Sequence, residues 1–313
     1  MNEVVLEAVG VSKAYGDVQA VKGISFRVKR GEIFGLLGPN GAGKTTTISM
    51  LTGLIEPDSG EIHLLGSRFT PHSRRLKARI GFVPQELALY PTLSGWENLS
   101  FFGRIYGLKG SLLRERIEAV LKMVGLSERA GDTVETYSGG MKRRLNIAAG
   151  LIHEPELLFL DEPTVGVDPQ SRNAILESVK ELKEHGVTII YTTHYMEEAQ
   201  RLCDRVAIVD EGRIIALDTP AAIIEREGIG MIRVRIGEGD FAPFAERIAA
   251  LPGVKRVYRQ DGWNIVEAAN ARETFVGIVE TAVRLNVPVE AVEILEPNLE
   301  TVFLKLTGKA LRD

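Results

Sequence analysis

The clearest chemical signal in this chain is a loop of small residues at positions 38–45, which reads Gly-Pro-Asn-Gly-Ala-Gly-Lys-Thr. It matches the pattern G-x-x-x-x-G-K-[ST] and lies between an apolar stretch, residues 33–37, and a helix-forming stretch, residues 45–51. In such a loop, backbone N–H groups converge on a polyphosphate at a helix N-terminus, Lys44 can reach the β- and γ-phosphates, and the Thr45 hydroxyl can bind Mg²⁺. The loop therefore predicts a nucleoside triphosphate site and leaves the reaction open.

Two adjacent acids provide the second signal. Asp161 and Glu162 end the apolar run 157–160. One carboxylate at the C-terminal end of a parallel strand can hold Mg²⁺, and a second can orient and deprotonate an attacking water. A helix-capping pair is the structural alternative, and the buried strand makes it the weaker one. His194 also follows a strand-like run, so we expect it at the same site.

The elements that must position these groups alternate between strands and helices from residue 33 to residue 209. This alternation predicts a mostly parallel sheet with right-handed crossovers, whose ligands gather at the C-terminal ends of the strands. Two earlier strands, 4–9 and 23–29, form an antiparallel subdomain, and a helical insertion covers about residues 86–150. We expect an α/β domain over residues 1–227.

Residues 228–313 follow a different pattern, with the order strand, helix, strand, strand, helix, strand. This order predicts a small ferredoxin-like α+β domain. In its closing helix, four apolar residues recur at helical spacing on one face behind a potential cap, Asn298. They are Leu299, Val302, Phe303 and Leu306. Such a stripe must be covered, either by the domain's own sheet or by a partner protein, and we expect this domain to serve assembly rather than chemistry.

The composition is that of a soluble globular protein, with 44% hydrophobic and 26% charged residues. No stretch approaches the ~18 uncharged apolar residues of a membrane span, and the N-terminus lacks the features of a signal peptide. The single cysteine, Cys203, excludes an intrachain disulfide, and the basic cluster 142–144 is interpreted as a solvated face. The net charge of −4 provides no basic field for nucleic acid. We expect a cytoplasmic protein that binds no nucleic acid.

Six motifs occur in a characteristic order and spacing. They are the loop 38–45, Gln85, the turn Ser138, Gly139 and Gly140, the pair Asp161 and Glu162, then Asp168, and His194. Together they resemble the ATP-binding cassette (ABC) ATPases, and the resemblance covers about residues 4–220. It implies the P-loop ABC-type fold and the hydrolysis of ATP with Mg²⁺.

The resemblance also implies which residues bind ATP and the metal. Tyr15 would stack on adenine, and Mg²⁺ would be held through Thr45, Gln85 and Asp161. The phosphates would be wrapped by Gly38, Pro39, Asn40, Gly41, Ala42, Gly43, Lys44, Thr45 and Thr46.

The remaining roles implied by the resemblance concern catalysis and a homodimer. Glu162 would be the general base, assisted by Lys44, with Gln85 touching the attacking water and His194 contacting the γ-phosphate. Asp168 would couple two sites across the dimer. The γ-phosphate of ATP held by the other subunit would be bound by Ser138, Gly139 and Gly140.

The signature turn departs from the usual family pattern, because Tyr137 and Met141 stand where Leu and Gln are typical. This variant and the C-terminal domain resemble the ATPases of drug-resistance, sodium-extrusion and polysaccharide or lipid exporters. The resemblance implies an exporter subunit that works beneath a separately encoded integral membrane permease, peripheral on the inner face of the cell membrane. The alternatives are a soluble ABC ATPase acting on nucleic acid or ribosomes, and the ATPase of an ABC importer.

Overall fold

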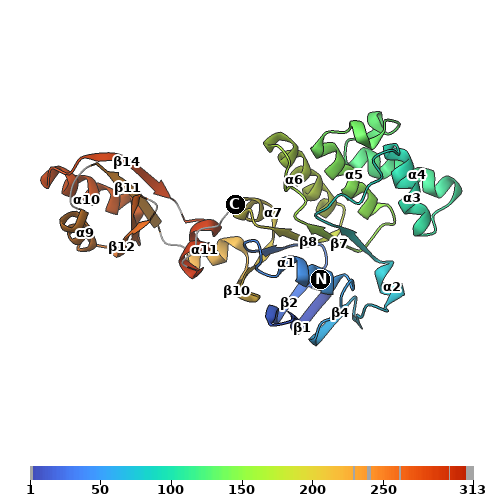
Figure 1. The fold of residues 1–313 in the computed structure, drawn as a ribbon, viewed down its shortest axis with the longest axis horizontal. Coiled ribbons are helices and arrows are strands. Elements are labelled where there is room, and N and C mark those ends of the chain that lie inside the picture. The colour runs from blue at the N-terminus through green and yellow to red at the C-terminus, as the bar shows by residue number, and fades with distance from the viewer. Residues whose placement is uncertain (1–2, 228–229, 238–240, 261, 296, 308–313) are drawn as a thin grey trace. The chain divides into compact units, whose positions relative to one another are not determined.

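The computed structural model describes residues 3–227, 230–237, 241–260, 262–295 and 297–307. The chain divides into two compact units, Met1–Pro220 and Ala221–Leu311, which are coloured blue to yellow and orange to red in Figure 1. Helix α8 (Pro220–Glu227) is grouped with the second unit. The domain boundary after residue 227 stays a prediction, and Gly228 and Ile229, which follow it, lie outside the described residues.

The first unit is organised around a sheet with the strand order β10-β9-β3-β8-β7-β6. Neighbours from β9 to β6 pair in parallel, as the sequence predicts, whereas β10 pairs antiparallel to β9 and was not predicted. Every residue of β3, β7 and β8 is buried, which explains the apolar runs 33–37 and 157–160, while in β8 the buried residues include Thr188, Thr192 and Thr193. The bounds are β3 (Ile33–Leu37), β6 (Ile80–Val83), β7 (Leu157–Asp161), β8 (Thr188–Thr193), β9 (Arg205–Asp210) and β10 (Arg213–Asp218).

A second, antiparallel sheet has the order β2-β1-β4-β5. Its strands are β1 (Val4–Tyr15), β2 (Val18–Lys29), β4 (Ser59–Leu64) and β5 (Ser67–Arg68). The two sheets share one apolar core, in which Phe26 of β2 stacks on Phe34 of β3 at a ring distance of 5.0 Å. Helix α1 (Lys44–Leu51) contributes Ile48 and Met50 to this core, so the helix behind the phosphate loop is held by apolar burial.

The predicted helical insertion contains α3 (Gly95–Ile105), α4 (Gly110–Met123) and α5 (Gly139–Leu151). Helix α3 begins with a capping box, since Ser94 Oγ accepts from the backbone N–H of Glu97 at 3.1 Å and Glu97 Oε2 accepts from that of Ser94 at 2.8 Å. The other helices of the first unit are α2 (Arg74–Lys77), α6 (Pro169–Glu184) and α7 (Met196–Leu202). The expected class, a P-loop α/β fold with an antiparallel subdomain and a helical insertion, is confirmed.

The second unit contains an antiparallel sheet with the order β12-β13-β11-β14. Its elements follow the order strand, helix, strand, strand, helix, strand along the chain. They are β11 (Gly230–Ile236), α9 (Phe241–Ala249), β12 (Val254–Gln260), β13 (Trp263–Ala268), α10 (Ala271–Arg284) and β14 (Val289–Leu295). One apolar core joins Val234 and Val266 of the sheet to Phe244 of α9 and Ile278 of α10. This is the order of a split β-α-β unit.

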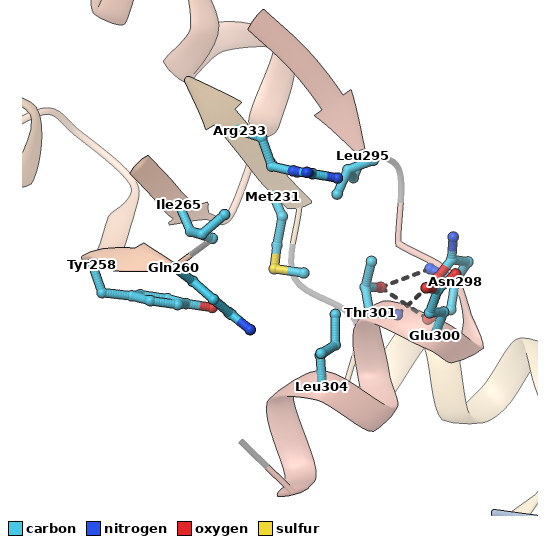
Figure 2. A pocket seen from close by; sticks show the side chains of 10 residues that line it. All are labelled: Met231, Arg233, Tyr258, Gln260, Ile265, Leu295, Asn298, Glu300, Thr301 and Leu304. Atoms are coloured by element: carbon cyan, nitrogen blue, oxygen red, sulfur yellow. Dashed lines mark hydrogen bonds between the residues drawn. The ribbon is translucent and has the colours of Figure 1, made fainter. Parts of the chain in front are cut away.

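The closing helix α11 (Leu299–Thr307) is capped as expected, because Asn298 Oδ1 accepts from the backbone N–H of Thr301 at 2.8 Å. Met231 of β11 and Leu304 of α11 are directed toward a cavity of about 330 Å³ between sheet and helix (Figure 2). Of the predicted stripe, Leu306 remains 37% exposed, while Leu299, Val302 and Phe303 are already buried in the single chain. Those three residues therefore offer no free surface to a partner.

This difference within α11 gives a matched pair of substitutions. Leu299→Ala removes a fully buried side chain and should lower the free energy of unfolding of the second unit by about 2–5 kcal/mol, because a cavity remains. Leu306→Ala removes a half-exposed leucine from the same helix and should cost far less. Urea unfolding can be followed by Trp263 fluorescence in a Trp96→Phe background, since these are the chain's two tryptophans. Equal destabilisation by both substitutions would contradict the described packing.

Candidate active site

The predicted site residues gather where three adjacent parallel strands end. Strand β8 lies between β3 and β7, and Leu37 of β3 and Asp161 of β7 pair with Thr193 and Thr192 of β8. The phosphate loop follows β3, Glu162 follows β7 and His194 follows β8. The parallel register therefore brings these three segments to one edge of the sheet.

The phosphate loop lies so close to neighbouring backbone that glycine is required at two positions. A Cβ at Gly38 would lie 2.2 Å from the carbonyl oxygen of Val209, and one at Gly43 would lie 2.4 Å from that of Ala20. Gly43 also has a φ of 101°, in the left-handed region. The loop ends at the N-terminus of α1, where free backbone N–H groups favour an anion. Along this loop Asn40, Gly41 and Thr45 are exposed, Pro39, Gly43 and Thr46 are intermediate, and Gly38, Ala42 and Lys44 are buried.

Three predicted catalytic side chains are in direct contact. Glu162 Oε1 lies 3.0 Å from Lys44 Nζ, and Glu162 Oε2 lies 3.2 Å from His194 Nδ1. Lys44 and Glu162 are only 4% and 5% exposed. Lys44 Nζ also donates to the carbonyl oxygens of Gly38 at 2.8 Å and Pro39 at 3.1 Å. A buried lysine ammonium therefore joins the phosphate loop to the Glu162 carboxylate, which His194 contacts from β8.

The backbone of Glu162 adopts an unusual conformation, with a φ of 46°. A left-handed conformation at a residue other than glycine costs about 1–3 kcal/mol and persists only where the surroundings hold it. Here the Glu162 N–H donates to Thr192 Oγ1 at 2.9 Å and lies 3.2 Å from the Thr192 carbonyl oxygen. The turn directs the carboxylate away from the strand and toward Lys44 and His194.

Asp161 is 2% exposed, and its burial raises the pKa of the carboxyl group above its usual range. Hydrogen bonds from Thr192 Oγ1, 2.6 Å from Asp161 Oδ1, and from the Thr45 side chain favour the charged form and oppose this shift. A hydroxyl and a carboxylate in contact are the hard oxygen donors that Mg²⁺ prefers, together with phosphate oxygens. Thr45 and Asp161 therefore suit a magnesium ion bound with a nucleotide.

Tyr15 and Gln85 lie at the ends of strands. Tyr15 is the last residue of β1 and 52% exposed, so its ring can receive a base. Gln85 follows β6, which pairs with β7, and its exposed side chain makes no hydrogen bond to Asp161 or Glu162 in the described part of the chain. Its carbonyl oxygen instead accepts from the Arg143 guanidinium of α5.

Arg143 is a residue that sequence reasoning missed. Its second amino group, Nη2, donates to the Val165 carbonyl oxygen at 3.2 Å, so one guanidinium joins the helical insertion to Gln85 and to the turn after Glu162. The interpretation of cluster 142–144 as a solvated face is wrong for this residue, which is only partly exposed. A lone arginine in a basic cluster carries no sequence signal of such contacts.

The remaining predicted residues form a second group at two helix N-termini. Ser138 caps α5 by accepting from the Met141 N–H at 3.3 Å, and Asp168 caps α6 by accepting from the Ser171 N–H at 2.9 Å. Hydrogen bonds from Ser171 lower the pKa of Asp168. A Cβ at Gly140 would lie 2.3 Å from Ser171 Oγ, so the two helices meet closely. No hydrogen bond or ion pair between described residues joins this group, which includes Gly139, to Lys44, Glu162 or His194.

Comparison with known proteins identifies the family. A family model described as ABC transporter matches residues 21–165. The linearmycin resistance ATP-binding protein LnrL of Bacillus subtilis is 49% identical over 98% of this chain and 100% of its own length. The Nod factor export ATP-binding protein I of Ralstonia nicotianae is 41% identical over 99% of this chain and 95% of its own length.

The fold comparison agrees with the sequence comparison. A dimeric ATP-binding cassette solved in a post-hydrolysis state with ADP and Pi superposes with a TM-score of 0.62 at 26% identity, covering 68% of this chain and 98% of the other. The resemblance carried by the six motifs is thus confirmed. Because the identity to LnrL extends over nearly its whole length, the chain belongs to the ABC transporter ATP-binding proteins, and it is an ATPase.

Proposed function

We propose that this chain hydrolyses ATP as one half of a homodimer and drives export through a separately encoded membrane permease. The observation that carries the proposal is the near-complete coverage of two relatives, one named for resistance and the other for export. The match includes the second unit as well as the cassette. No helix in the described ranges is long and apolar enough to cross a bilayer. In this proposal the permease holds the chain at the inner face of the cell membrane.

In the proposed reaction Glu162 is the general base. Its contacts with Lys44 and His194 orient the carboxylate, so that it can accept the proton of an attacking water. On nucleotide binding, Lys44 exchanges the carbonyl oxygens of Gly38 and Pro39 for phosphate oxygens. Thr45 and Asp161 hold Mg²⁺, which when bound neutralises charge on the phosphates. Gln85 orients the water, and Tyr15 stacks on adenine.

The second group completes the site from the other copy. Ser138, Gly139 and Gly140 open α5 with backbone N–H groups that suit an anion, and within one chain this turn makes no contact with the Lys44 ammonium. We therefore assign it to the γ-phosphate held by the partner, with Asp168 beside it at the same interface. The dimeric state of the solved cassette relative supports this arrangement.

An exposed apolar surface on the helical insertion supports the permease as a partner. Tyr90 and Phe101 are 46% and 40% exposed, and their rings lie 4.9 Å apart. Ile105, one turn after Phe101 on α3, is 63% exposed. Contiguous apolar groups on a surface mark interaction sites. Because Tyr90 follows Gln85 by five residues, a permease on this surface would lie close to the segment that senses the nucleotide.

The alternatives differ in partner or direction. A nucleic-acid or ribosome ATPase is disfavoured by the net charge of −4 and by the names of the two relatives. An importer would use the same catalytic residues, and only the direction of transport separates it from an exporter.

The export proposal predicts both a partner and a direction. An integral membrane protein should copurify with the chain from solubilised membranes, and Phe101→Ser should reduce its recovery because the apolar contact is lost. Leu54→Ser, at a residue 62% exposed outside α3, is the matched control and should leave recovery unchanged. In inside-out vesicles containing both subunits, ATP should drive accumulation of linearmycin, the compound to which LnrL confers resistance. ATP-driven loss from preloaded vesicles would indicate import.

The catalytic proposal predicts that Glu162→Gln binds MgATP but hydrolyses it about 10²- to 10⁴-fold more slowly, the range for loss of a general base. Asp161 and Lys44 remain, so nucleotide affinity should survive, and ATP should trap a dimer visible by gel filtration. Glu184→Gln, which changes an exposed glutamate at the end of α6, should hydrolyse ATP normally. Near-normal turnover by Glu162→Gln would refute the assignment.

The dimer proposal predicts that Ser138 acts on the partner's nucleotide. The single natural cysteine, Cys203, is buried, so cysteines placed at Ser138 and at Asn40 of the loop can be crosslinked selectively. Two chains, each bearing one of these cysteines, should crosslink to each other when ATP is added to a Glu162→Gln background. Crosslinking within one chain carrying both cysteines, or between chains without ATP, would count against this geometry.

A further inference from the structure

One buried carboxylate near the site has no role in the mechanism so far. Glu198 lies on α7 and is 4% exposed. Three hydroxyl groups donate to its Oε2 atom: Thr164 Oγ1 at 3.0 Å, Tyr191 OH at 2.9 Å and Thr193 Oγ1 at 3.1 Å. Its Oε1 atom lies 3.5 Å from Nε of Arg172. A buried charge is costly unless it is hydrogen-bonded, so the three hydroxyl bonds hold their donors firmly. The contact with Arg172 is an ion pair only, because neither its Nε atom nor Glu198 Oε1 has a hydrogen-bond partner among the described residues.

The donors belong to the segments that carry the site. Thr164 comes two residues after Glu162, and Thr193 directly precedes His194. The Thr193 hydroxyl also accepts from the N–H of Tyr195 at 2.9 Å, so it holds the backbone on both sides of His194. Glu198 thereby ties the turn after β7 to the turn after β8.

Arg172 extends this network toward the proposed dimer interface. It stands on α6, one turn after the cap Asp168, whose carbonyl oxygen accepts from the Arg172 N–H at 2.9 Å. Its guanidinium lies 4.3 Å from the centre of the Tyr195 ring, and that ring lies 4.1 Å from the His194 ring. The start of α6 is therefore in contact with the segment that carries His194.

The strained backbone of Glu162 explains why the turn after β7 has to be held by contacts such as that of Thr164 with Glu198. Its φ of 46° is held on one side by the two contacts of its N–H with Thr192. On the other side, the Val165 N–H closes a turn onto the Glu162 carbonyl oxygen at 3.3 Å, and Thr164, inside that turn, is fixed by Glu198. The second side of the turn therefore has two anchors, Glu198 through Thr164 and Arg143 through the Val165 carbonyl oxygen, and of these only Glu198 also reaches the segment that carries His194.

We propose that Glu198 is a positioning residue, which holds Glu162 and His194 in the geometry that hydrolysis needs and links them through Arg172 to Asp168. The inference rests on the roles proposed above for Glu162 and His194. A purely structural carboxylate would lower stability when replaced, while the protein that remains folded would hydrolyse ATP normally. Turnover and nucleotide affinity of the folded protein therefore separate the two roles.

The main test is Glu198→Gln in the full chain. The neutral amide oxygen accepts the three hydroxyl bonds more weakly than the carboxylate does, and the amide nitrogen is a second donor beside Arg172. We expect kcat to fall about 10- to 100-fold, as for a misplacement of about 1 Å at a reacting group. The affinity for a fluorescent ATP analogue should be unchanged, because none of the hydrogen bonds described for Glu198 ends on the loop 38–45. The matched control is Glu197→Gln, the exposed neighbour on α7, which should leave kcat unchanged.

Two smaller changes at Thr164 test the same role in case Glu198→Gln does not fold. Thr164→Val keeps the shape of the side chain but removes one donor, and it should lower kcat with less effect on folding. Thr164→Ser restores the hydroxyl and should recover most of the loss. If Thr164→Val and Thr164→Ser hydrolyse ATP equally well, or if folded Glu198→Gln has a normal kcat, the positioning role is wrong.

A double substitution distinguishes this inference from the proposed function. Glu198→Gln added to Glu162→Gln should slow single-turnover hydrolysis by a smaller factor than Glu198→Gln does alone, because only His194 is left for Glu198 to position. Losses that multiply would overturn the proposal. Normal turnover by Glu162→Gln alone would instead refute the general base itself, whereas a slow Glu162→Gln beside a normal Glu198→Gln refutes only the positioning role.

Discussion

The structure depends most on the buried contact of Glu162 with Lys44 and His194. Two charged groups, Lys44 and Glu162, lie out of water beside the partly buried His194, and their burial is tolerable only because they pair with each other. Their contact requires the strand order β3-β8-β7 in parallel register, since one residue of slippage would move Glu162 away from Lys44. The catalytic contact therefore depends on the strand order and register of the central sheet.

The phosphate loop links the two sheets of the first unit. At Gly43 it lies against the backbone of Ala20 in β2, and at Gly38 against Val209 in β9. The antiparallel subdomain is thus a wall of the nucleotide site as well as a part of the shared core. Its first strand also ends at Tyr15, so the base and the phosphates would be contacted from elements that pack on each other.

Much of this arrangement could be predicted because it follows from short-range patterns. Continuous apolar runs identified β3 and β7, and the strand-like run before His194 identified β8. Residues that follow parallel strands must share one edge of the sheet, which brought Lys44, Glu162 and His194 together. Edge strand β10 was missed because its alternation is weak and it is partly exposed. The contacts of Arg143 and Glu198 join residues 58 and 34 positions apart, to Gln85 and Thr164, and no local pattern reports such pairs.

The two groups of site residues suggest how hydrolysis and assembly depend on each other. Within one chain, Glu162 is fixed by contacts with its own strands, while Ser138 and Asp168 cap two helices that would face the other chain in the proposed dimer. In a two-fold dimer each chain would contact the partner's nucleotide with the same residues that the partner uses in return. The two nucleotides would therefore lie in one symmetric interface. Arg143 and Arg172 would then have similar roles. Arg143 joins the turn after Glu162 to α5, and Arg172 joins the segment after His194 to α6. The N-termini of both helices would face the other chain. Loss of the γ-phosphate would remove the anion from the N-terminus of α5 in the other chain, and Arg143 of α5 would carry that change back to the turn after the general base.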